Sequence, residues 1–112
     1  MSSFSTISLS TVSHCALVTA RQGDSEQVGL ALSALVEPAL AMPGCLHFAV
    51  QRSHGDERLW QVAGVWRDQA AMTAWLNSPG MQVFSDLVHG LLVTSLDLHT
   101  FGDAALEHAS AA

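Results

Sequence analysis

The 112-residue sequence contains no lysine, and its cationic side chains are Arg21, Arg52, Arg58 and Arg67. Ten acidic residues give it a formal net charge of −6. Proteins that bind nucleic acids or anionic membrane surfaces need clustered basic side chains to replace the counterions of phosphate groups. This sequence has no such cluster, so we expect no nucleic-acid partner and no membrane partner.

Long apolar runs and dense cysteines are missing as well. No apolar run approaches the ~18 residues that a membrane-spanning helix requires. Residues 1–13 lack the positive charge and the long apolar core of a secretory signal, and we interpret them as a disordered leader of a cytoplasmic protein. Cys15 and Cys45 fall on strands that we expect not to be neighbours, so we do not expect a disulfide.

Charged residues are scarce, at 12% of the chain, whereas hydrophobic residues make up 49%. The length fits one domain, which buries roughly two-thirds of the surface of its unfolded chain. So little charge is unusual for a small monomer. We therefore expect a second copy of the chain to cover part of the surface as a homodimer.

Hydrophobic periodicity predicts a strand followed by a long helix in the first part of the chain. Residues 14–21 are apolar and β-branched and form the predicted strand. Asp24 and Gln27 have the spacing of a capping box, and Pro38 should interrupt the helix near Val36 or Glu37. The apolar positions that recur along this helix are Val28, Leu32, Leu35, Val36, Ala39 and Leu40.

A hairpin is predicted next, with strands at 45–53 and 58–66 joined by a turn that contains glycine. In the first of these strands, Leu46, Phe48 and Val50 alternate with smaller or polar residues. In the second, one face carries Trp60, Val62, Gly64 and Trp66.

The last third of the chain predicts two short helices and a strand at 92–101. Asp68 should cap a helix that runs to about Asn77. Ser78 should cap the next helix, with Pro79 at its first position and Gly90 at its end. The predicted buried residues of this second helix are Val83, Phe84, Leu87, Val88 and Leu91.

This order of elements is typical of the ferredoxin-like split βαβ fold of the α+β class, in which helices cover one face of a four-stranded antiparallel sheet. The predicted domain spans residues 14–101, and residues 102–112 are a predicted flexible tail. The strand at 58–66 is largely apolar on both sides. A homodimer that pairs sheet with sheet is the simplest cover for the second face.

Two segments resemble the antibiotic biosynthesis monooxygenase family. VEPALAMPGCLHFAV (36–50) resembles the junction of first helix and second strand in that family, where a Pro-Gly-Cys turn recurs. VAGVWRDQAAMTAWLNSP (62–79) is similar to the family's strand-to-helix junction, which carries a Glu-x-Trp motif. The resemblance covers about residues 14–101. It implies a dimeric α+β barrel with a pocket between the helices and the sheet of each subunit.

Members of that family include cofactor-independent oxygenases of polycyclic phenols, haem-degrading enzymes and many proteins of unknown role. The sequence departs from the family at two positions: Gly64 replaces the motif's glutamate, and Trp75 replaces a helix histidine. That histidine ligates iron in the haem-degrading branch, and an asparagine of the same branch has no counterpart near Thr19 and Ala20. No histidine pair has helical spacing either, so we expect no metal and no cofactor.

Trp66 and Trp75 are the strongest candidates for a binding site. If Trp66 faces the helices and Trp75 faces the sheet, both border one cleft, and Gly64 removes a side chain from its floor. Such a slot would hold a planar aromatic ligand by stacking. The alternative is that both tryptophans simply fill the core. The other residues that we predict to line the pocket are Phe48, Phe84 and Trp60.

These candidates lead to two functional hypotheses. The first is a cofactor-independent monooxygenase of a small planar phenol or quinone, with His47, His89 and Trp66 as catalytic residues. An imidazole titrates near neutral pH and can remove the proton of a phenol. The second is a small-molecule-binding or stress-associated dimeric barrel protein without turnover. Gly64 and Trp75 at the motif positions favour the second hypothesis, and the range of family activities supports the first.

Overall fold

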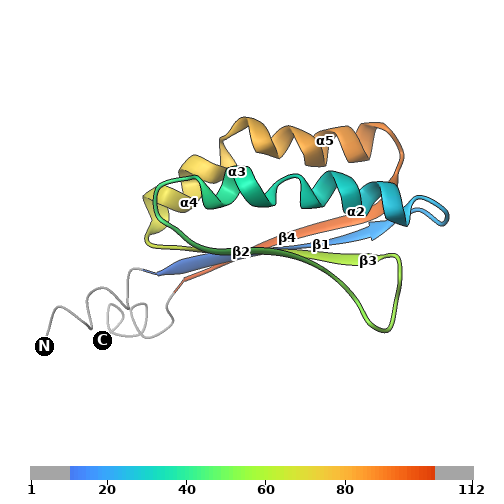
Figure 1. Cartoon of the computed structure of the whole chain (residues 1–112), viewed down its shortest axis with the longest axis horizontal. Helices are drawn as coiled ribbons and strands as arrows, with labels where there is room; N and C mark the ends of the chain where they lie inside the picture. Colours follow the sequence, from blue (N-terminus) through green and yellow to red (C-terminus); the bar gives the residue numbers. More distant parts are fainter. Residues whose placement is uncertain (1–10, 103–112) are drawn as a thin grey trace, which may run out of the picture.

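In the computed structural model, which describes residues 11–102, four antiparallel strands form one sheet with the order β2-β3-β1-β4. The helices all lie on one face of this sheet (Figure 1). This arrangement confirms the predicted ferredoxin-like α+β fold. The strands are β1 (Val12–Ala20), β2 (Cys45–Arg52), β3 (Leu59–Trp66) and β4 (Val93–Phe101).

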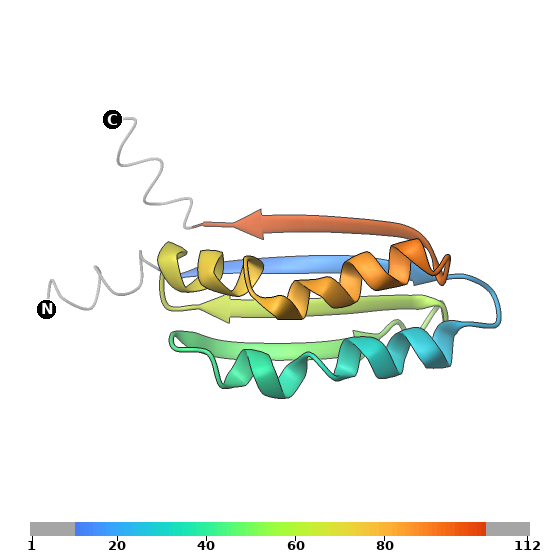
Figure 2. The same cartoon turned by 90° about the horizontal axis from the view of Figure 1, so that it is seen from above.

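Two helical segments run side by side across the sheet (Figure 2). One consists of α2 (Ser25–Ser33) and α3 (Val36–Leu40), and the other of α4 (Gln69–Leu76), the 3₁₀ turn η1 (Pro79–Met81) and α5 (Gln82–His89). Strand β4 lies at the edge of the sheet, and its residues after Val93 are all exposed. The sheet is therefore covered over its centre and open along β4.

The predicted long helix is interrupted, but earlier than expected. Helix α2 ends at Ser33, and Pro38 lies in the first turns of α3. A proline ring clashes with the carbonyl four residues before it, which here is that of Ala34, and the break falls at that residue. The predicted capping box is wrong, because the Asp24 side chain accepts no cap hydrogen bond. Its φ of −108° and ψ of 6° are not the extended conformation that capping requires.

Strand β2 contains a bulge that corrects the predicted alternation. Cys45 pairs with Trp66 and His47 pairs with Val65, so Leu46 is an extra residue between two pairs. Leu46 is consequently 59% exposed, although we predicted that it faces inward with Phe48. His47 pairs with Val65 and precedes the buried Phe48, so it lies on the face of the sheet that points away from the helices.

The caps of α4 and α5 agree with the sequence in part. The Asp68 carboxylate accepts a hydrogen bond of 2.9 Å from the backbone N–H of Ala71, as predicted. The Ser78 side chain does not cap the next helix. Its hydroxyl instead donates to the carbonyl of Trp75 at 2.7 Å and so closes the end of α4. Pro79 begins η1, where its missing N–H has no cost.

Helix α5 ends at Gly90, but the left-handed residue is the next one, Leu91, with φ of 59°. The N–H of Leu92 donates to the carbonyl of Leu87, and the N–H of Leu91 donates to that of Val88. This pair of bonds is the Schellman arrangement, which prefers glycine at its left-handed position. Leu91 and Val88 are 65% and 44% exposed, and Leu40 of α3 is 53% exposed, so these three predicted core residues lie at the surface.

The predicted leader and tail concern mostly residues 1–10 and 103–112, which lie outside the described residues. Strand β1 begins at Val12, inside the range that we assigned to the leader. Within residues 11–102, no helix is long and apolar enough to span a bilayer.

Leu91→Gly should stabilise the protein. Glycine removes a steric penalty of roughly 1 kcal/mol at a left-handed position, and the exposed leucine loses little burial. Leu40→Gly is the matched control, since Leu40 is similarly exposed but lies in a right-handed helix, where glycine should cost about 1 kcal/mol. Urea denaturation of both variants measures the two effects, and destabilisation by Leu91→Gly would show that the left-handed backbone carries no strain.

Candidate functional site

Four aromatic side chains from four elements form a ring of contacts at one end of the core. Trp66 of β3 stacks on Trp75 of α4, with centroids 6.0 Å apart and an interplanar angle of 25°. Phe48 of β2 meets Trp75 edge-on at 5.3 Å. His14 of β1 completes the ring, 6.2 Å from Trp66 and 5.9 Å from Phe48. We call His14, Phe48, Trp66 and Trp75 the aromatic quartet.

Gly64 makes room for the imidazole of the aromatic quartet. It pairs with His14 across β1 and β3 and with Phe48 across β2 and β3. A Cβ atom at Gly64 would lie 2.6 Å from Nε2 of His14 and 3.0 Å from Nε1 of Trp66. Any larger residue would therefore displace the imidazole. We predicted that Gly64 leaves the floor of a cleft empty, but the side chain of His14 fills the space above this glycine.

Next to the aromatic quartet lies an apolar cavity of about 130 Å³. It is bounded by the sheet on one side and by α4, η1 and α5 on the other. Leu96 and Leu98 of β4 border it and are 36% and 53% exposed, so the cavity meets solvent along the edge strand. The nine described residues that line it are His14, Ala16, Val62, Trp75, Leu76, Met81, Phe84, Leu96 and Leu98.

His14 is the titratable residue in this lining, and it is only 4% exposed. Within residues 11–102, neither of its ring nitrogens has a hydrogen-bond partner. The indole N–H groups of Trp66 and Trp75 are also buried without a partner. Burial lowers the pKa of His14 below its ordinary value of 6.5, because an apolar environment disfavours the charged imidazolium. His14 is therefore a neutral imidazole at pH 7, with one nitrogen free to accept a proton.

The structure brings together five of the eight residues that the sequence singled out. Trp75 and Phe84 line the cavity directly. Trp66, Phe48 and Gly64 lie behind this lining, where the two aromatic rings pack within the quartet. Trp66 thus lies within the core, whereas Trp75 packs in the core on one side and borders the cavity on the other.

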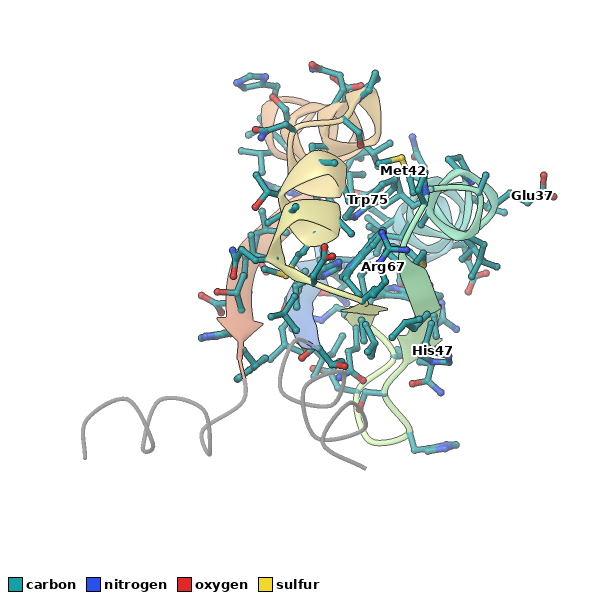
Figure 3. All side chains as sticks on the ribbon, turned by 90° about the vertical axis from the view of Figure 1, so that its left-hand side faces the viewer. Glu37, Met42, His47, Arg67 and Trp75 are labelled. Carbon is teal, nitrogen blue, oxygen red and sulfur yellow. The ribbon has the colours of Figure 1, made fainter. Side chains whose placement is uncertain are left out.

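The other three residues lie elsewhere. His47 is exposed on the opposite face of the sheet, and Figure 3 shows it on β2, away from Trp75 and the helices. His89 is exposed near the end of α5, where its Nδ1 lies 3.5 Å from the Ser85 hydroxyl. Trp60 is near the start of β3, donates its indole N–H to Ser25 at 3.0 Å and lies beneath Arg52. None of the three borders the cavity.

Sequence reasoning missed His14. One signal was available, because His14 is in phase with Ala16, Val18 and Ala20, the residues of β1 that face the helices. The decisive fact was not available. That His14 lies opposite Gly64 depends on the register between β1 and β3, which periodicity within one strand does not fix.

The cysteines and carboxylates add no chemistry at this site. Both cysteines are free thiols, and strand β3 separates β1, which carries Cys15, from β2, which carries Cys45. Burial raises the pKa of the Cys45 thiol, which makes a reactive thiolate less available. Within residues 11–102, no group of three or more His, Cys, Asp or Glu side chains could hold a metal ion.

The buried neutral state of His14 should make stability depend on pH. The unfolded chain binds a proton below pH 6.5 more readily than the folded chain does, because the folded-state pKa is lowered. The free energy of unfolding should therefore fall as the pH drops below 6.5, by at most about 1.4 kcal/mol per pH unit for one proton, until the folded-state pKa is reached.

Denaturant titrations from about pH 7.5 to about pH 5 measure this dependence. His14→Gln should remove that part of the slope, while His54→Gln, at an exposed turn, should keep it. Identical slopes in the wild type and in His14→Gln would mean that His14 is not desolvated.

Several solved structures resemble this chain. PA3566 from Pseudomonas aeruginosa is 26% identical, with a TM-score of 0.74 over 84% of this chain and 94% of its own. Protein SO0527 from Shewanella oneidensis is 20% identical, with a TM-score of 0.78 over 85% and 92%. A variant of SnoaB, described as a cofactor-independent oxygenase from Streptomyces nogalater, is 17% identical, with a TM-score of 0.71 over 85% and 94%.

No curated protein matches the sequence. The family model described as antibiotic biosynthesis monooxygenase matches residues 11–87, which is more than half of the chain. This match confirms the resemblance that the two sequence segments indicated, and the chain belongs to the antibiotic biosynthesis monooxygenase family.

Proposed function

We propose that this protein is a cofactor-independent monooxygenase of a small planar phenol or quinone-type substrate. One observation carries the proposal: an apolar cavity next to the aromatic quartet contains a buried, neutral and unpartnered imidazole, that of His14. Buried polar groups are normally hydrogen-bonded, so a side chain with two unpaired nitrogens beside a cavity favours a ligand that would pair with one of them.

The proposed chemistry needs a base and a dry site. The neutral imidazole accepts the proton of a bound phenol, and the resulting electron-rich phenolate reacts with dioxygen. One oxygen atom enters the ring to give a quinone, and the other leaves as water with two hydrogens of the substrate. The substrate supplies all the electrons, so no external reductant is required. The cavity contributes orientation and the exclusion of bulk water.

The residues have distinct roles in this proposal. His14 takes the part of base that the sequence assigned to His47 or His89, because those two side chains are exposed away from the cavity. Trp75 and Phe84 form aromatic walls for the ring of the substrate. Trp66 supports both His14 and Trp75 by stacking and acts through them.

The alternative function is binding without turnover, as a small-molecule-binding or stress-associated protein. Gly64 and Trp75 favour it, since they stand where the resemblance implies a glutamate and a histidine. The same cavity would then hold an aromatic molecule, and His14 would serve as a hydrogen-bond partner. The two functions differ in whether dioxygen is consumed.

Oxygen uptake in the presence of electron-rich phenols and hydroquinones tests the proposal. The wild type should consume dioxygen with substrate, and His14→Gln should lower kcat/KM by about 100-fold or more, which is typical for the loss of a general base. Because burial lowers the pKa of His14, the acid limb of the wild-type kcat/KM profile should lie below pH 6.5.

His54→Gln, at an exposed turn, is the matched control and should leave kcat/KM and its acid limb unchanged. Saturable binding without oxygen uptake across the panel would favour the binding protein. If the His14→Gln variant turned over substrate as fast as the wild type, His14 would have no role in the mechanism.

We also propose that the protein is a homodimer that pairs the open faces of two sheets and that it acts in the cytoplasm. The open face carries apolar residues at its centre, where Ala63 lies between Cys15 and Ala49, and at its ends, where Leu17 and Phe101 are 36% and 54% exposed. Such a face gains from burial against a second copy. Two free thiols are compatible with a reducing compartment.

Ala63→Glu should dissociate the dimer, because it places a carboxylate from each copy at the centre of the apolar contact. Sedimentation equilibrium should give twice the chain mass of 11.9 kDa for the wild type and the chain mass for the variant. Ser33→Glu adds the same charge on the exposed side of α2 and should remain a dimer. A wild type that sediments as a monomer at all concentrations would refute the pairing.

A further inference from the structure

The cavity beside the aromatic quartet is small, and its size limits the ligand. Its volume is about 130 Å³. A well-known engineered cavity of about 150 Å³, lined by aliphatic and aromatic residues, stays dry and binds benzene. The enclosed part of the present cavity thus has room for one six-membered ring with a small substituent, and a second fused ring must press against the side chains at its solvent side.

The inner walls of the cavity resist expansion. Trp75 is 1% exposed and is held by Trp66 and Phe48 of the quartet. On its outer side, a Cβ atom at Gly80 would lie 2.9 Å from the Trp75 ring, so η1 packs closely against it. Val62, 1% exposed, belongs to a central strand. A ligand that needs more room must displace packed core residues, which is unfavourable in well-packed interiors.

The solvent side of the cavity is less constrained. Met81 and Phe84 are partly buried, and Leu96 and Leu98 are 36% and 53% exposed on the edge strand. These side chains have fewer neighbours to fix them than Trp75 has. We therefore expect a ligand to enter from this side. These side chains are also the ones that can move to fit the shape of the ligand.

The polar character of the lining limits the ligand further. His14 offers one nitrogen to one ligand oxygen, and the other lining residues are apolar apart from the indole of Trp75. None of the nine described lining residues carries a positive charge. A carboxylate or a second hydroxyl at the inner end would be buried without a partner, which is unfavourable.

We infer that the cavity selects single-ring monophenols, with the ring against Trp75 and Phe84 and the hydroxyl on the His14 imidazole. This inference rests on the proposed function, since it names the substrate class of the same site. It can nevertheless be tested by binding alone, without turnover, so that its failure is distinct from the failure of the monooxygenase proposal.

Three fluorinated probes separate ring number from hydrogen bonding. Fluorine NMR titrations would compare 4-fluorophenol, fluorobenzene and 6-fluoro-2-naphthol with the wild type. We expect 4-fluorophenol to bind about tenfold more tightly than fluorobenzene, which corresponds to one hydrogen bond. The naphthol should bind at least about tenfold more weakly than the phenol, since its second ring exceeds the cavity and must displace lining side chains such as Phe84.

Two variants make the test specific to this cavity. Phe84→Ala enlarges the solvent side and should strengthen naphthol binding about tenfold relative to phenol binding. Val88→Ala removes a 44% exposed residue one turn further along α5, outside the cavity lining, and should change neither affinity. His14→Leu should abolish the preference of phenol over fluorobenzene, and thermal unfolding would verify that it folds.

The outcomes are distinct. Selective phenol binding in the absence of oxygen uptake would support the cavity assignment and would refute turnover. Equal or tighter binding of the naphthol by the wild type would overturn the single-ring limit. Equal binding of fluorobenzene and 4-fluorophenol, or wild-type selectivity in His14→Leu, would overturn the role of His14.

Discussion

The contact between His14 and Gly64 is the constraint on which the rest of the site depends. A polar imidazole enters the core because the facing strand has no side chain at that position. The imidazole then stacks on Trp66, Trp66 stacks on Trp75, and Trp75 forms a wall of the cavity. A substitution at Gly64 would therefore disturb three aromatic side chains and the cavity in one step.

This arrangement has a cost in stability. Three buried residues, His14, Trp66 and Trp75, carry ring nitrogens that lack a partner. A buried polar group without a hydrogen bond is generally unfavourable by about 1–3 kcal/mol, which is a substantial part of the net stability of a small domain. Packing alone gives no reason to keep the imidazole of His14 unpaired beside the cavity. A ligand that pairs with this imidazole would explain its position, which connects the energetic cost with the proposed function.

The departures from the family motif acquire a physical meaning in this arrangement. Where the resemblance implies a glutamate, Gly64 leaves room for the imidazole of His14, and where it implies a histidine, Trp75 forms a wall of the cavity of about 130 Å³. The titratable group is thus supplied by β1 instead of by the motif positions. The described lining of the cavity thus carries an imidazole that comes from β1.

The sequence by itself determined the order of the elements and the cap at Asp68, because these depend on local periodicity and on hydrogen bonds between near neighbours. It also singled out Trp75 and Phe84, and both border the cavity in the structure. It selected His47 and His89 and missed His14. The pairing of His14 with Gly64 brings this imidazole to the cavity, and it is a property of strand register. Register arises when strands distant in the sequence pack against a common helical layer, so only the tertiary structure could show which histidine meets the cavity.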